Sequence, residues 1–126
     1  MKIYLAARYQ RKDEMAAWGN VLKRFGHEVT STWIYGGEEG LTRPQIARLD
    51  LNDVARAEAV MSFTETAGTA TPRGGRHVEF GYGLALGLKM IIIGEKENVF
   101  HELDGIEVCS TLDDWIAQQE DAIVGL

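Results

Sequence analysis

The chain has 126 residues and a net charge of −6, with 45% hydrophobic and 25% charged residues. This length predicts one domain over residues 1–126, and the composition is typical of a globular protein rather than a disordered or fibrous one. The acidic balance argues against a nucleic-acid polymer as partner, because such proteins neutralise phosphates with basic residues.

The one cysteine, Cys109, excludes an internal disulfide and a zinc site built on several thiolates. The three histidines show no metal-ligand spacing, so we expect no metal and no cofactor. No apolar run approaches the ~20 residues of a membrane span, and the N-terminal apolar stretch is too short for a signal peptide. We therefore expect a cytoplasmic protein with no membrane partner.

Short apolar strands alternate with amphipathic helices along the chain. The expected elements, in order, are strand 2–7, helix 12–25, strand 28–33, helix 44–57, strand 59–63, helix 76–88, strand 89–94, a fifth strand at 106–109 and a helix from Thr111. This alternation predicts an α/β fold of three layers, with a parallel sheet of four to five strands between helices. Ligands of such sheets bind beyond the carboxyl ends of the strands.

Glu79 is the residue most out of place. Its segment, VEFGYGLALGL, is otherwise apolar or glycine, which predicts a helix buried on all sides. An uncompensated buried carboxylate is costly, so we expect Glu79 to face a polar cleft or a partner. The alternative is a first-turn glutamate that returns a capping bond.

Two further acids fall on an apolar helix face. Ile46, Leu49 and Val54 mark the inward face of the 44–57 helix, and at about 100° per residue Asp50 and Asp53 fall on that face too. We expect one or both to point into a site at the sheet edge; the alternative is an ordinary salt bridge.

Two carboxylates without a metal suit chemistry at an anomeric carbon. One attacks or shields the oxocarbenium-like centre, and the other assists the leaving group. A glutamate with its usual pKa of ~4.3 is already ionised at pH 7 and can act as a nucleophile without a base.

The segment from Thr71 to His77 joins a strand to a helix start. Gly74 and Gly75 permit close backbone approach, free N–H groups there attract anions, and Arg73 and Arg76 could add charge-assisted bonds to a phosphate or carboxylate. The alternative is a plain surface loop. Trp33, at a strand end, either stacks on a base or belongs to the core.

The sequence resembles the nucleoside 2-deoxyribosyltransferase family over nearly its whole length. The resemblance is carried by KIYLAAR, the Asp50 helix, ARAEAVMSF and GGRHVEFGYGLALGLKMIIIGEKENVFH, and it is most specific around Glu79. It implies a flavodoxin-like fold. Members transfer a 2-deoxyribosyl group between nucleobases, and a related branch hydrolyses the N-glycosidic bond of nucleoside 5′-monophosphates.

The resemblance also implies roles for individual residues. Glu79 matches the nucleophile that forms a covalent deoxyribosyl-enzyme, and Asp50 matches an aspartate near the sugar and base that assists leaving-group protonation. Tyr4 matches an aromatic residue that orients Glu79 or the sugar. Asn98 resembles a residue that reaches the sugar 5′ end in a neighbouring subunit, which implies a homodimer or larger homo-oligomer with shared active sites.

The chain departs from the family pattern in three places. Glu58 replaces the usual aspartate before the third strand. Ala6, Ala7 and Arg8 stand where Gly or Pro is usual. Arg73 stands six residues before Glu79, where transferases carry an acidic residue and monophosphate hydrolases a serine. An arginine there favours a 5′-phosphate; the alternatives are that it binds a carboxylate or covers the site. The expected substrate-binding residues are Arg8, Trp33, Asp53, Arg73, Gly74, Gly75, Arg76 and Asn98.

We therefore expect an enzyme that cleaves the N-glycosidic bond of a (2-deoxy)nucleoside or its 5′-monophosphate, with transfer to a second nucleobase or to water. The alternative is a non-catalytic nucleotide-binding sensor on the same fold. A flavodoxin-type electron carrier would need a hydroxyl-rich and Gly-rich phosphate loop after the first strand, and AARYQRK is not one.

Overall fold

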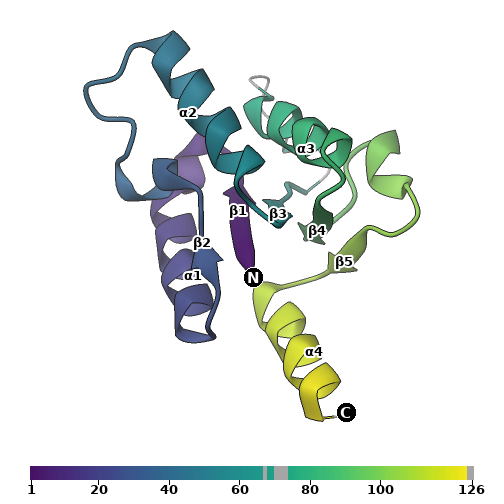
Figure 1. Cartoon of the computed structure of the whole chain (residues 1–126). Coiled ribbons are helices and arrows are strands. Elements are labelled where there is room, and N and C mark those ends of the chain that lie inside the picture. The colour runs from purple at the N-terminus through teal and green to yellow at the C-terminus, as the bar shows by residue number, and fades with distance from the viewer. Residues whose placement is uncertain (67, 70–73, 125–126) are drawn as a thin grey trace.

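The computed structural model describes residues 1–66, 68–69 and 74–124 (Figure 1). The strands are β1 (Lys2–Ala6), β2 (Glu28–Val29), β3 (Ala59–Phe63), β4 (Lys89–Ile93) and β5 (Glu107–Cys109). The α-helices are α1 (Lys12–Arg24), α2 (Arg43–Ala55), α3 (Gly75–Ala85) and α4 (Leu112–Val124). Three short 3-10 helices, η1 (Tyr9–Arg11), η2 (Thr32–Tyr35) and η3 (Val99–Glu102), lie in the connections.

The five strands form one parallel sheet in the order β2-β1-β3-β4-β5. The connections between the strands place α2 and α3 side by side on one face of the sheet and α1 on the other (Figure 1), and α4 follows β5 and contacts it. The α/β architecture with a parallel sheet of four to five strands is confirmed, and the strand order is that of flavodoxin. The order reverses between β1 and β3, so the carboxyl ends of these two strands flank the crevice where ligands of this fold bind.

The core forms where the apolar strands meet the helices. All five residues of β3 are buried, and so are Ile3 to Ala6 of β1. A Cβ added at Gly83 would lie 2.5 Å from Val60 Cγ2. Glycine at this position of α3 therefore lets the helix lie close against β3, which fixes the helix that carries Glu79.

Two expectations about these elements are wrong. The second strand ends at Val29 rather than Trp33, because Ser31 Oγ accepts a hydrogen bond from Leu5 N (3.1 Å) and η2 follows. The helix expected at 76–88 is not buried on all sides. Val78 is 63% exposed and Leu86 is 46% exposed, because the described part of the chain leaves the outer face of α3 uncovered.

None of the helices described here combines the length and the apolar character that a membrane span requires.

Candidate active site

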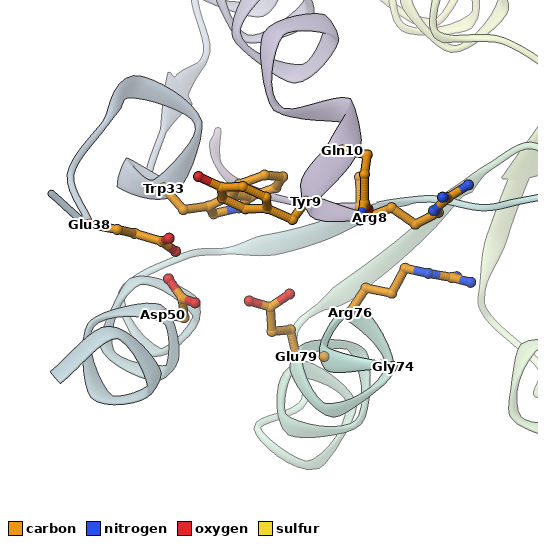
Figure 2. Close-up of a pocket in the computed structure, with 11 residues that line it drawn as sticks. Arg8, Tyr9, Gln10, Trp33, Glu38, Asp50, Gly74, Arg76 and Glu79 are labelled. Atoms are coloured by element: carbon orange, nitrogen blue, oxygen red, sulfur yellow. The ribbon is translucent and has the colours of Figure 1, made fainter. Parts of the chain in front are cut away.

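A cleft of about 410 Å³ opens at the carboxyl ends of β1 and β3 (Figure 2). This volume is in the range of small-molecule sites. Segments that follow β1, η2 and β3 all contribute to it, as the flavodoxin strand order predicts. Its lining residues are Ala7, Arg8, Tyr9, Gln10, Trp33, Glu38, Asp50, Gly74, Gly75, Arg76 and Glu79.

Glu79 enters the cleft from α3 and is held by Tyr4. The hydroxyl of Tyr4, a fully buried residue of β1, donates a hydrogen bond to Glu79 Oε2. The pKa of Glu79 is raised to about 8: burial is the largest cause, the Tyr4 hydrogen bond opposes it, and the charges of Asp50, Glu38 and Asp53 add to the rise. The expectation that Glu79 keeps its usual pKa is therefore wrong, because the carboxyl lies in a poorly solvated site among other acids.

Asp50 enters the cleft from α2, and its carboxyl group points toward that of Glu79 (Figure 2). Its Oδ1 is buried and has no hydrogen-bond partner among the described residues. The pKa of Asp50 is raised to about 7, first by burial and then by the charges of Glu38 and Asp53. Between pH 7 and 8 the Asp50 and Glu79 carboxyls therefore share about one proton.

This shared proton defines what the pair can do chemically. In the state with a neutral Asp50 and an ionised Glu79, one group can donate a proton while the other attacks an electrophilic carbon. Because Glu79 has the higher pKa of the two, the single proton resides mainly on Glu79, and the reactive state with the proton on Asp50 is the less populated one.

Asp53, which we expected to bind substrate, lies outside the cleft and is 2% exposed. Its Oδ2 accepts hydrogen bonds from Thr32 N (3.0 Å) and Thr32 Oγ1 (2.7 Å), and its Oδ1 accepts from Arg56 Nη2 (3.1 Å). The expectation is wrong because these bonds occupy both carboxylate oxygens: Asp53 ties α2 to η2, and the alternative reading as a salt bridge is the one observed.

The arginine end of the cleft is organised by two glutamates. Arg8 Nη1 donates to Glu65 Oε1 (2.8 Å), and Arg76 Nη2 donates to Glu97 Oε2 (2.7 Å). Arg8 Nε is buried and has no hydrogen-bond partner within the part of the chain that the structure describes. The N-cap of α3, Gly74, adopts φ +64° and offers no side-chain cap, so backbone N–H groups at this helix start remain available to an anion.

Three other expected residues have different positions. Trp33 is both core and cleft wall: it is 4% exposed, and its Nε1 donates to Leu5 O (2.9 Å). Asn98 does not line this cleft; its side chain accepts from Phe100 N (3.0 Å) and caps η3. Arg73 lies outside the described residues.

Glu38, Tyr9 and Gln10 also line the cleft, although they were not among the expected site residues. The signal for Glu38 was present: two glutamates interrupt the glycine-rich segment IYGGEEGLTR, between a strand end and a helix start. Among the described residues, no cluster of three His, Cys, Asp or Glu side chains could hold a metal ion.

The chain is similar in structure to three enzymes. The first is a CMP N-glycosidase from Clostridium botulinum, with a TM-score of 0.66 and 16% identity over 95% of this chain and 98% of the other. The second is a 2-deoxyribosyltransferase from Bacillus psychrosaccharolyticus, with a TM-score of 0.70 and 20% identity over 91% of this chain and 90% of the other. The third is a 2-deoxyribosyltransferase from Leishmania mexicana, with a TM-score of 0.56 and 16% identity over 84% of this chain and 76% of the other. No family model and no curated protein sequence matches the chain. The structural likeness confirms the flavodoxin-like fold.

Proposed function

We propose that this chain is a member of the nucleoside 2-deoxyribosyltransferase family and cleaves the N-glycosidic bond of a (2-deoxy)nucleoside or its 5′-monophosphate. The observation that carries the proposal is the pair formed by Glu79 and Asp50. Glu79 is oriented by a buried tyrosine and faces an aspartate that has no ion-pair partner among the described residues. A second support is the fold, which the chain shares with an N-glycosidase and two deoxyribosyltransferases.

The reaction proceeds in two displacements. A carboxylate oxygen of Glu79 attacks C1′, the C1′–N bond breaks, and the Asp50 proton passes to the departing base. Tyr4 holds the other Glu79 oxygen by its hydrogen bond. A water molecule or a second nucleobase then attacks C1′ from the vacated face, Asp50 accepts its proton, and Glu79 leaves as a carboxylate.

The arginine end of the cleft suits the 5′ end of the substrate. Arg8 Nε is a buried N–H without a partner in the described parts of the chain, and the uncapped start of α3 lines the same cleft. Both features favour a phosphate. Arg8 and Arg76 already bind Glu65 and Glu97, so a phosphate would join an existing ion-pair network rather than meet free cations.

A second groove suggests that another copy of the chain completes the site. This groove, of about 430 Å³, lies between α2 and α3 and also reaches Asp50 and Glu79. Its other lining residues are Arg43, Ile46, Ala47, Leu51, Gly75 and Val78. A protein surface over Ile46, Ala47, Leu51 and Val78 would shield the reacting carboxyls from bulk water. We therefore propose a homodimer or larger homo-oligomer.

A chromatographic assay for released base tests the proposal. The panel is the common nucleosides and their 5′-monophosphates, ribo and deoxy, with and without a second free base. Release without an acceptor indicates a hydrolase, and a new nucleoside formed only with an acceptor indicates a transferase. Glu79→Gln should abolish either activity while keeping the fold, and wild-type rates in that variant would refute the proposal. Nucleotide binding without any release would instead indicate the sensor.

A further inference from the structure

Glu38 is an acidic residue of the cleft wall that the proposed reaction does not use. Its loop between η2 and α2 is closed by hydrogen bonds from Gly37 N to Thr32 O (3.0 Å) and from Leu41 N to Glu38 O (3.1 Å). A Cβ added at Gly37 would lie 2.8 Å from Thr32 Cβ, so glycine is what lets the loop fold this closely onto η2. The loop therefore fixes the half-buried Glu38 in the cleft wall.

Glu38 and Asp50 form an unpaired acidic couple. Figure 2 shows the carboxyl group of Glu38 pointing toward that of Asp50. Within the described residues, neither carboxyl group takes part in a hydrogen bond or ion pair, and Asp50 Oδ1 is buried as well. Burial raises the pKa of Glu38, with Lys12 opposing the rise. A buried polar group without a partner is costly, so a ligand with complementary hydrogen-bonding groups would satisfy this couple.

The same end of the cleft carries its aromatic surface. The rings of Tyr9 and Trp33 lie with centroids 6.3 Å apart at 32°, and both line the cleft. The Trp33 ring is fixed by its bond to Leu5 O. Aromatic faces bind nucleobases by stacking. The base end of a substrate therefore lies at Tyr9, Trp33 and Glu38, and its 5′ end lies at the arginines.

We propose that Glu38 selects nucleobases that carry an exocyclic amino group beside a ring nitrogen, such as cytosine or adenine, over their oxo counterparts uracil and hypoxanthine. This inference rests on the proposed function of the cleft. Glu38 accepts from the amino group, as carboxylates do from the amino group of cytosine, while neutral Asp50 donates to the adjoining ring nitrogen. The couple thus presents one acceptor and one donor, which match an amino group and a ring nitrogen.

An oxo base reverses this pattern. Uracil and hypoxanthine carry a carbonyl oxygen where the amino group would be, and a ring N–H where the acceptor nitrogen would be. The carbonyl oxygen would face the Glu38 carboxylate, leaving both oxygens without a donor. A site built around a specific hydrogen-bond pattern rejects such analogues strongly, because its buried polar groups are left unpaired.

Matched substrate pairs test the inference. The pairs are deoxycytidine with deoxyuridine and deoxyadenosine with deoxyinosine, as nucleosides and 5′-monophosphates. We expect kcat/KM to favour the amino member by roughly 10- to 100-fold. Glu38→Gln should reduce this preference at least about tenfold, because an amide both donates and accepts. Glu39→Gln is the matched control: Glu39 is exposed, lies next to Glu38 and does not line the cleft, so the preference should persist.

Equal or reversed preference in the wild type, or an unchanged preference in Glu38→Gln, would overturn the inference while base release still supports the proposed function. If no substrate is cleaved, calorimetry with the same pairs on Glu79→Gln decides. If Glu79→Gln binds the amino member more tightly and the double variant with Glu38→Gln does not, the inference is supported and the proposed reaction is refuted. Equal binding, or none, would overturn it.

Discussion

Glu79→Gln should stabilise the protein at alkaline pH. Burial raises the pKa of Glu79 from 4.5 to about 8. Stability from this group is therefore fully present below a pH of about 4 and is lost as pH rises through the folded-state pKa. At about 1.4 kcal/mol per pKa unit, the interval corresponds to at most roughly 5 kcal/mol of unfolding free energy. The carboxyl group is buried but lines the cleft, and water in the cleft screens part of its charge, so we expect a gain of about 2 kcal/mol.

Glutamine suits this test because its amide oxygen can still accept the Tyr4 hydrogen bond while its charge is gone. Urea unfolding followed by circular dichroism would give the unfolding free energies of both proteins at pH 5 and pH 9. The difference should be small at pH 5 and large at pH 9, and Glu39→Gln, at an exposed site, should show no such trend. If the unfolding free energies of the wild type and of Glu79→Gln change with pH in parallel, Glu79 is not a buried carboxyl group with a raised pKa.

Three further predictions concern the rest of the site. Tyr4→Phe removes the bond that lowers the pKa of Glu79, so kcat should fall by about 10- to 100-fold and the acidic limb of the pH–rate profile should move to higher pH; an unmoved limb would contradict this. Arg8→Gln removes the unpartnered Nε, so the loss in kcat/KM should be about tenfold greater for 5′-monophosphates than for nucleosides. Equal losses for both substrate classes would show that Arg8 does not bind the phosphate. Val78→Glu places a charge in the α2–α3 groove, so analytical ultracentrifugation should show dissociation to monomers. An oligomer mass equal to that of the wild type would show that this groove is not part of the interface between copies.

The sequence predicted the architecture because the strong signals are local. Met90 to Ile93 of the KMIIIG segment are buried in strand β4, and helices follow the strands as the apolar spacing indicates. Glu79 and Asp50 were found for a related reason: each is a charge on an apolar surface, which is costly unless a cleft receives it. The structure places both in the same cleft.

What the sequence did not predict depends on contacts between distant segments. Asp50 and Asp53 share a helix face, but Thr32 donates to Asp53 and takes it out of the cleft. Glu38 enters the cleft through a loop whose path depends on left-handed Gly36, at φ +81°, and no periodic pattern encodes that path. The raised pKa of Glu79 likewise follows from burial beside other acids, which residue spacing alone does not report.

The most direct test of the central claim is mass spectrometry of the protein after reaction with a 2-fluoro-2-deoxy nucleoside, an analogue that slows hydrolysis of a glycosyl-enzyme. The account predicts one added fluorosugar on the tryptic peptide 77–89, localised to Glu79 by fragmentation, and no adduct on Glu79→Gln. An adduct on another residue, or base release from the analogue with no adduct at all, would contradict Glu79 as the nucleophile.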